Sequence, residues 1–208
     1  MDTYEAISRR KTIRDFRQEE ISMDIVKRLL DAGLQAPSHD HLRAWQFVIV
    51  HNRSKRRELI EQTIKPRSRD EAIAMVSGWG LTSELEREMY LDAIPKQFSM
   101  LLNAGCLILP CFRQTTPLLQ PESLSSLNAF AAMWCCIENI LIAAASEGIF
   151  GVTRIPSEEE RATIKRILNV PTDYEIPCYV ALGYPQESAA RAKQVKVSVD
   201  ERMHLNIW

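Results

Sequence analysis

The chain has 208 residues, a length that suits a single domain with a sizeable core. Its 26 lysines and arginines nearly balance its 27 acidic residues, which excludes an overall field that would draw it to nucleic acid or an acidic membrane. The five cysteines form no Cys-x-x-Cys pair, and the first residues form no apolar signal region. These features indicate reduced thiols and a cytoplasmic protein, and we expect neither nucleic acid nor a membrane among its partners.

Capping residues and apolar periodicity predict helices and strands along most of the chain. The expected helices cover residues 3–8, 23–32, 54–64, 82–93, 96–102, 127–147 and 158–168. Strands are expected at 46–50, 106–112 and 178–183, with a short extended segment at 148–156. Ser22 should cap the second helix and Gly33 should end it. Residues 66–80 show no clear pattern, and residues 114–125 are expected to form a loop that covers a site.

Residues 127–147 form the longest segment that fits only a buried helix, because apolar side chains occur nearly all the way round it. Ser125 or Ser126 could accept hydrogen bonds from its first free N–H groups, and Gly148 should end it in a left-handed conformation. Glu138 interrupts the apolar run, which argues against a membrane span. We therefore expect this helix in the core of the domain or at the seam between two subunits.

A cluster of cations follows the first expected helix. It consists of Arg9, Arg10, Lys11 and Arg14, with the Thr12 hydroxyl among them. Guanidinium, ammonium and hydroxyl donors together suit a phosphate or a carboxylate. A solvated basic turn explains the same residues, and the spacing alone does not decide between the two.

Two further stretches carry polar groups between predicted elements. Residues 36–45 lie between a helix and a strand, where polar side chains are well placed to face a ligand. Their pair of histidines, His39 and His41, lacks a second ligand cluster, so we expect no metal. Thr153 and Arg154 could present backbone and side-chain donors to an anion, or could lie in a plain surface connection.

Several well-known nucleotide and catalytic motifs are missing from the chain. It contains no P-loop, and Gly78-Trp79-Gly80 lacks both the third glycine and the preceding strand of a dinucleotide fingerprint. No serine elbow, paired carboxylates or Cys-His spacing identifies a nucleophile. If the protein is an enzyme, its reactive group is expected to come from a phosphate-bearing cofactor.

Four motifs together resemble the flavin-dependent nitroreductase family in order and spacing. They are Ser-Arg-Arg-Lys-Thr-Ile-Arg-Asp-Phe at 8–16, Ala-Pro-Ser at 36–38 with Trp45, Glu-Asn-Ile-Leu-Ile-Ala-Ala at 138–144, and Leu-Gly-Tyr-Pro at 182–185. The resemblance implies an α+β fold with a central mixed sheet flanked by helices. It also implies one domain over residues 1–208, an intertwined homodimer, and a tail from about residue 186 to 208 that packs on the partner subunit.

The resemblance implies FMN as cofactor, with NADH or NADPH as co-substrate. The implied phosphate, ribityl and pyrimidine contacts are Arg10, Lys11, Thr12 and Arg14, with Lys193 and Lys196 as basic tail residues. The implied contacts from the other subunit are Pro37, Ser38, His39 and His41. The segment with Thr153, Arg154 and Ile155 would place its backbone near the reactive N5 side of the flavin. No side chain is expected to be catalytic, because the chemistry is carried by FMN N5.

The implied mechanism is a ping-pong transfer of hydride to an electron-poor small molecule such as a nitroaromatic, a quinone or an activated alkene. The family loop usually reads Ala-Pro-Ser-x-x-Asn-x-Gln-Pro-Trp, whereas this chain has His41, Arg43 and Ala44 in place of Asn, Gln and Pro. A reductive dehalogenase, a flavin-fragmenting enzyme and a flavin-binding protein without turnover therefore remain alternatives.

Overall fold

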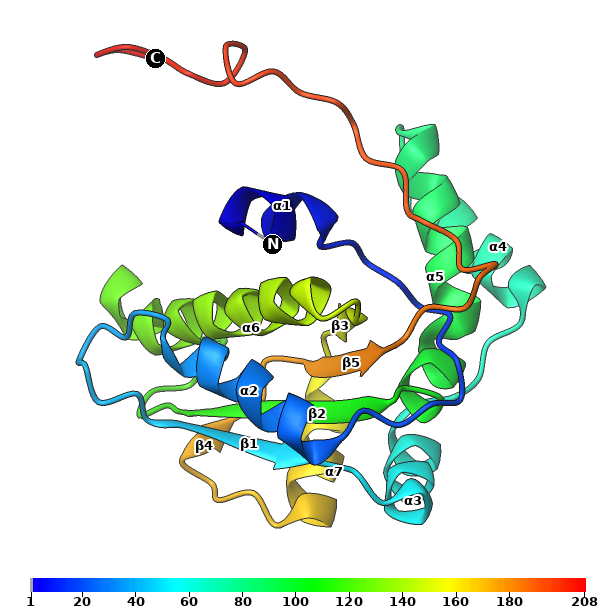
Figure 1. Ribbon diagram of the computed structural model, residues 1–208, viewed down its shortest axis with the longest axis horizontal. Coiled ribbons are helices and arrows are strands. Elements are labelled where there is room, and N and C mark those ends of the chain that lie inside the picture. Colours follow the sequence, from blue (N-terminus) through cyan, green and yellow to red (C-terminus); the bar gives the residue numbers. More distant parts are fainter. Residues whose placement is uncertain (1) are drawn as a thin grey trace.

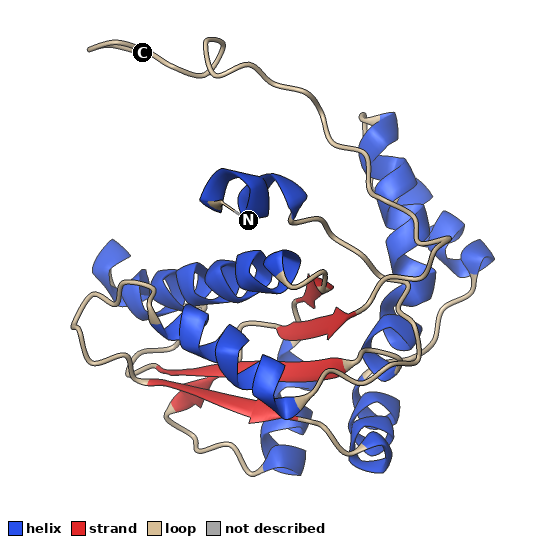
Figure 2. Cartoon of the chain, in the orientation of Figure 1, coloured by secondary structure: helices blue, strands red, loops and turns tan. Residues whose placement is uncertain are grey.

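The computed structural model describes residues 2–208 and has an α+β architecture (Figures 1 and 2). The sheet has the strand order β1-β2-β5-β3, and the short β4 pairs with β2 outside that order. The helices are α1 Thr3–Arg9, α2 Met23–Leu34, α3 Arg53–Thr63, α4 Arg69–Ser77, α5 Glu84–Leu102, α6 Asn128–Ser146 and α7 Glu158–Leu168. The strands are β1 Trp45–Ile49, β2 Cys106–Arg113, β3 Phe150–Arg154, β4 Tyr174–Glu175 and β5 Tyr179–Gly183.

The central strand β2 is buried on both faces, and its alternating side chains divide the core in two. Ile108 and Phe112 pack on the face covered by α2 and α6. Leu107 and Leu109 pack on the opposite face, against α3, α7 and the C-terminal end of α5. The helices therefore flank the sheet on both sides, and α1 lies over α6 as a further layer (Figure 1).

The helix α6 confirms the prediction of a buried core helix. Its approach to α2 is close, because a Cβ on Gly33 would lie 2.7 Å from Ile140 Cγ1. By length and hydropathy the stretch Leu124–Ser146 could cross a membrane, but residues such as Ile140 and Ala144 are fully buried against the sheet. Gly148 has a φ of +74°, as the predicted left-handed end requires.

The predicted ends of three helices need correction. The short 3-10 turn η1 (Leu124–Leu127) leads into α6, so Leu127 rather than a serine occupies the cap position, with no side-chain cap bond. Gly33 lies inside α2 and does not end it. Asn52 caps α3, accepting from Lys55 N at 2.9 Å, so that helix begins before Ser54. By contrast, α7 begins at the predicted residue, and Ser157 caps it through a reciprocal capping box with Glu160.

Two predictions in the middle of the chain were wrong or incomplete. One continuous helix, α5, replaces the two expected around Pro95. A proline removes one backbone donor, but burial of Ile94 before it and Met100 and Leu101 after it fixes both halves of the helix. The unassigned region contains α4, which begins with a capping box between Ser68 and Glu71.

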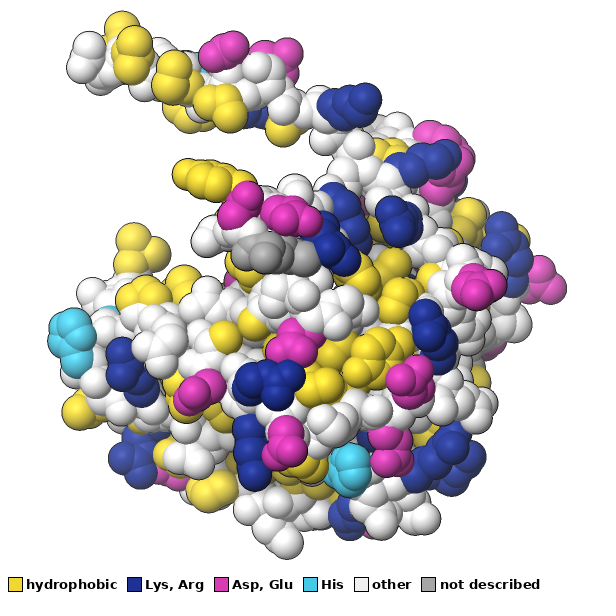
Figure 3. All heavy atoms as spheres, viewed as in Figure 1, with side chains coloured by type: hydrophobic (Ala, Val, Ile, Leu, Met, Phe, Trp, Pro, Cys, Tyr) yellow, Lys and Arg dark blue, Asp and Glu magenta, His cyan; other side chains and the backbone are white. Residues whose placement is uncertain are grey.

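The chain from Ser188 to its end forms neither helix nor strand within the described residues. Its large apolar side chains are exposed from Val195 onward, and Trp208 is 100% exposed at its far end. Figure 3 shows the far part of this segment standing away from the rest of the chain, with apolar side chains along it. In an isolated chain a row of apolar side chains is therefore exposed to water, which is unfavourable.

Candidate functional site

The basic segment at residues 10–14 is held by backbone hydrogen bonds at the edge of the sheet. Thr12 forms a parallel bridge with Gly151, and Ile13 N donates to Gly151 O at 3.2 Å. Beyond it, Arg17 N donates to Tyr184 O at 2.9 Å. The segment is therefore fixed between β3 and the exit of β5, which is not what a freely solvated turn would show.

The register of this bridge decides which side chains share a face. Thr12 opposite Gly151 places Ile13 beside Val152 and Arg14 beside Thr153. Ile13 and Val152 are both buried in the core on the α3 and α7 side. Because side chains alternate along extended backbone, Thr12 and Thr153 lie on the opposite face, toward α6, whereas the Arg14 side chain points to α5. The structure thus brings together two groups that the sequence placed 140 residues apart.

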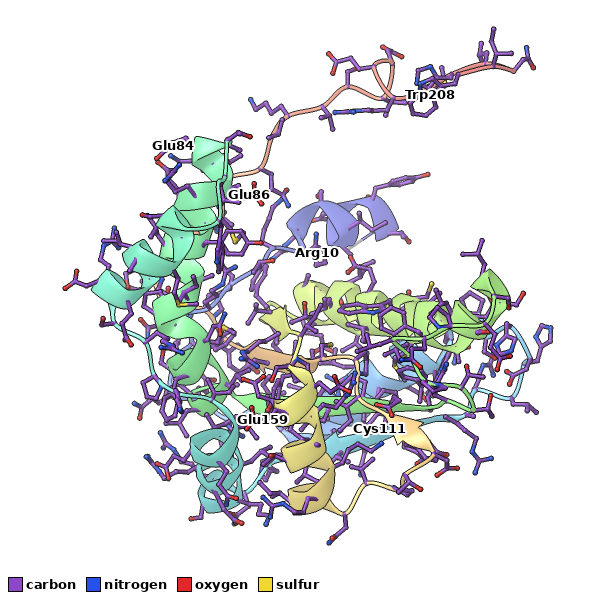
Figure 4. The ribbon with its side chains drawn as sticks, turned by 180° about the vertical axis from the view of Figure 1, so that it is seen from behind. Arg10, Glu84, Glu86, Cys111, Glu159 and Trp208 are labelled. Carbon is purple, nitrogen blue, oxygen red and sulfur yellow. The ribbon has the colours of Figure 1, made fainter. Side chains whose placement is uncertain are left out.

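Carboxylates from two helices hold the cations of the basic segment. Arg10 Nε lies 2.9 Å from Glu138 Oε1 of α6, and Figure 4 shows Arg10 at the end of α1, above α6. Arg14 Nη1 lies 3.4 Å from Asp92 Oδ2 of α5. Burial lowers the pKa of Arg14, while Asp92 and Asp15 oppose that shift, so the guanidinium stays charged near neutral pH.

Arg154 has a different role from Arg14, although both lie in adjacent extended segments. Its two terminal nitrogens each lie 2.8 Å from a carboxylate oxygen of Glu160, and its Nε donates to Gln97 Oε1 at 3.2 Å. The guanidinium also lies over the Tyr179 ring, 5.9 Å from its centroid. The Arg154 guanidinium is thereby occupied by partners within the protein. The segment with Thr153, Arg154 and Ile155 therefore offers a ligand mainly its backbone groups.

The loop before β1 has an unusual backbone. His41 and Arg43 have φ values of +58° and +47°, a region that residues other than glycine adopt infrequently. Ser38 is buried and its Oγ accepts from Arg43 N at 3.3 Å, and Asp40 Oδ1 accepts from Leu42 N at 3.1 Å. The bond from Leu42 N lowers the pKa of Asp40. The side chains of Pro37, His39 and His41 are exposed.

A cavity of about 280 Å³ opens beside this loop. Trp45 and Phe112 contribute aromatic surface to it, and Gln114, Thr116 and Ser126 contribute polar groups. The sequence predicted that residues 114–125 would cover a site, but it did not identify Phe112 or Ser126 as part of one. The polar, proline-containing composition of that loop was the available signal.

A second cavity, of about 460 Å³, lies at the basic segment. Four of its lining residues are cations, and only two of them, Arg9 and Lys11, belong to the cation cluster predicted from the sequence. The four are Arg9, Lys11, Arg17 and Arg191. The excess of donors here suits an anionic group.

The structure separates the basic segment from the loop at residues 36–45 within one chain. Trp45 pairs with Phe112 at one end of β2, whereas Leu182, just before the exit of β5, pairs with Cys106 at the other end. Six residues of extended chain separate these positions, which is roughly 20 Å. Figure 1 shows the loop and the basic segment at opposite ends of the sheet. One chain alone therefore does not bring its two predicted sets of cofactor contacts together.

The basic residues of the tail are placed unequally. Lys193 Nζ lies 3.3 Å from Glu88 Oε2 of α5, one helical turn from the Asp92 that holds Arg14. Lys196 lies further along the exposed tail. Among residues 2–208 no group of three or more His, Cys, Asp and Glu side chains could hold a metal ion.

Comparison with known proteins identifies the family. The model of the nitroreductase family matches residues 7–184. The chain belongs to the nitroreductase family. The family resemblance and the α+β fold predicted from the sequence are thereby confirmed, and the chain is a nitroreductase-family oxidoreductase.

Relatives from other organisms match over most of their length. A Methanothermobacter thermautotrophicus protein, itself provisionally assigned as an NADH dehydrogenase/NAD(P)H nitroreductase, is 27% identical over 213 residues that span 100% of this chain and 88% of its own. An NADH dehydrogenase of Thermus thermophilus is 26% identical over 201 residues, 90% of this chain and 88% of its own. A crystal structure of an iodotyrosine deiodinase bound to FMN and 3-iodo-L-tyrosine superposes over 100% of both chains, with a TM-score of 0.73 and 17% identity. That last likeness concerns the fold alone.

Proposed function

We propose that this protein is an FMN-dependent oxidoreductase that takes hydride from NADH or NADPH and passes it to an electron-poor acceptor. The acceptor would be a nitroaromatic, a quinone or an activated alkene, and the exchange would be ping-pong. The observation that carries the proposal is the basic segment, whose donors are held by backbone bonds beside Thr153 at the sheet edge. Its relatives named as NADH dehydrogenases support the choice of nicotinamide as electron donor.

The residues present fit FMN by the chemistry of their donors. Arg10, Lys11, Thr12 and Arg14 offer two guanidinium groups, an ammonium and a hydroxyl, which suit a phosphate, a ribityl chain and the polar edge of the flavin. Lys193 and Lys196 would add positive charge from the tail. The backbone at Thr153, Arg154 and Ile155 would lie near the flavin N5.

We propose that the site is completed by a second copy of the chain. Pro37, Ser38, His39 and His41 lie at the other end of the sheet, so they would reach the flavin held by the basic segment of the partner. The exposed apolar side chains of the tail would be buried in the same homodimer. On this proposal residues 1–208 form one domain, and the tail from about residue 186 to 208 packs on the partner.

Bound FMN would supply the hydride chemistry, and the protein would supply orientation and charge. Cations at the polar edge of the flavin would stabilise the negative charge of its reduced form. The backbone of the segment at 153–155 would fix the ring, and the Arg154 side chain would hold that segment by its bonds to Glu160. No side chain has to act as an essential acid. The five free cysteines accord with a cytoplasmic location.

A binding protein without turnover is the second candidate. The specific observation behind it is the loop with left-handed His41 and Arg43, where the chain departs from the family pattern. A specialised reductase, such as a dehalogenase, would have the same fold. These candidates differ in whether bound flavin is reduced by a nicotinamide and in which acceptor reoxidises it.

The proposal is tested by recording the absorbance spectrum of the purified protein with FMN, then adding NADH or NADPH without oxygen. Loss of the visible flavin bands is the expected result, followed by their recovery when a nitroaromatic or quinone is added. Bound flavin that neither nicotinamide reduces would favour the binding protein. Recovery only with a halogenated aromatic would favour the dehalogenase, and a protein that never binds FMN would refute the proposal.

A further inference from the structure

Four charged side chains form a continuous network between the basic segment and α5. Lys96 Nζ lies 2.7 Å from Asp15 Oδ2 and 2.6 Å from Asp92 Oδ1, and the other oxygen of Asp92 faces Arg14 Nη1 at 3.4 Å. The charges alternate along the chain Asp15, Lys96, Asp92, Arg14, so the network is neutral as a whole. A change to any one member leaves one uncompensated charge.

The network is shielded from solvent enough for an uncompensated charge to affect the electrostatic potential nearby. The Arg14 side chain is only 11% exposed, and those of Lys96, Asp15 and Asp92 are 26%, 27% and 34% exposed. Burial disfavours the charged form of Lys96, but hydrogen bonds to Asp15 and Asp92 outweigh it and raise its pKa. The Lys96 ammonium thus stays charged over the neutral range, and the partners of Arg14 limit both the position of its guanidinium and the electrostatic potential around it.

We propose that Asp92 and Lys96 are positioning residues that set the orientation and effective charge of Arg14 toward the bound flavin, and so tune its reduction potential. This inference rests on the proposed function, in which Arg14 contacts FMN. Neither Asp92 nor Lys96 has to touch the cofactor. Asp92 partly neutralises the Arg14 cation, and Lys96 partly neutralises Asp92. The two residues therefore act in opposite directions on the same electrostatic potential.

The test compares the flavin midpoint potentials of the FMN-loaded wild type and variants by spectroelectrochemical titration. Asp92→Asn removes a negative charge while keeping an oxygen that can accept from Arg14, so it should raise the potential. Lys96→Gln removes a positive charge and should lower it. Each shift is expected to be about threefold to tenfold in the reduction equilibrium, which for a two-electron couple is about 15–30 mV. The double variant should return close to wild type.

Glu84→Gln provides the matched control on the same helix. Glu84 pairs with Arg87 and is exposed at the outer end of α5 (Figure 4), eight residues from Asp92, or roughly 12 Å along the helix. Its replacement removes the same charge without touching the network and should leave the potential unchanged. Circular dichroism and FMN titration of each variant would verify that it folds and binds.

The results separate the inference from the proposed function. Shifts of opposite sign that cancel in the double variant would support the positioning role. Wild-type protein that binds and reduces FMN, with single variants that shift the potential in the same direction or not at all, would overturn this inference alone. Wild-type protein that binds no FMN would overturn the proposed function and the positioning role with it.

Discussion

The basic segment at residues 10–14 and the tail at residues 189–208 both carry cations, yet the chain holds them very differently. Backbone bonds fix the basic segment to β3, and the network through Asp92 fixes Arg14. The tail is tied by the exposed pair between Lys193 and Glu88, and its apolar side chains face solvent. One half of the proposed site is therefore built within a single chain, whereas on our proposal the other half comes from a second copy.

Alkaline pH should act on the core that supports the basic segment and not on the tail, which contains no cysteine. Burial raises the pKa of Cys106 and Cys136 to about 12 and that of Cys111 to about 11, and it also raises that of Cys178. Above the ordinary thiol pKa near 9 the unfolded chain loses protons that the folded chain keeps, so stability falls as pH rises. Each of these buried thiols should lower the free energy of unfolding by about 1.4 kcal/mol per pH unit.

Urea unfolding between pH 8 and pH 10.5 measures this loss. Cys106→Ala should reduce the slope of stability against pH by the share of one thiol, whereas Cys135→Ala, at an exposed position, should leave it unchanged. A slope that does not respond to Cys106→Ala would show that other groups control the alkaline transition.

Deleting residues 189–208 should dissociate the proposed dimer. The deletion removes Lys193, Lys196 and a row of apolar side chains. Full burial of one such apolar side chain contributes about 1.5–3 kcal/mol to the free energy of association. The dissociation constant of the dimer, measured by sedimentation equilibrium, should rise by on the order of a thousandfold or more. The matched variant Lys193→Gln/Lys196→Gln should stay dimeric and lose only FMN affinity. A truncated protein that remains a dimer would contradict the role given to the tail.

Arg10→Ala should weaken FMN binding by about 1.5–3 kcal/mol, the range for a charge-assisted hydrogen bond, or roughly 10- to 150-fold. Fluorescence titration with FMN measures it. The control is Arg28→Ala, because Arg28 forms a comparable 2.9 Å pair with Glu147 that lies outside the proposed site. Equal affinity in the wild type and the Arg10 variant would remove Arg10 from the site.

The smallest effect is expected for Glu88→Gln. Its pair with Lys193 joins side chains that are 53% and 75% exposed, and such pairs contribute less than about 1 kcal/mol. The free energies of unfolding and of dimerisation should therefore change by less than about 1 kcal/mol, measured by chemical unfolding and sedimentation. A loss of the dimer in this variant would mean that the ion pair, and not apolar burial, holds the tail.

Local patterns predicted those parts of the fold that depend on neighbouring residues. The burial of the apolar helix α6 and the left-handed glycine after it, Gly148, are such features, and both predictions are confirmed. The division of α5 at Pro95 was wrong because core contacts on both sides of the proline outweigh one missing donor. The start of α4 carried a readable signal in Ser68 and Glu71, but the helix has little amphipathic pattern.

The candidate site was harder to derive because it depends on tertiary contacts. The types of donor at Arg10 and Arg14 could be recognised from the sequence, but their partners Glu138 and Asp92 lie more than 75 residues away. Arg154 looked like an anion ligand by its residue type alone. Only the fold shows that Glu160 and Gln97 occupy its guanidinium. The separation of loop 36–45 from the basic segment likewise follows from the sheet order, which no local pattern contains.

Sedimentation velocity of the FMN-loaded protein, followed at the visible flavin band, tests most directly the claim that two chains build each site. We expect the flavin to sediment with a species of two chains, and we expect deletion of residues 189–208 to dissociate the dimer and release the flavin together. Flavin that sediments with a single chain, in full-length protein or after the deletion, would contradict this claim.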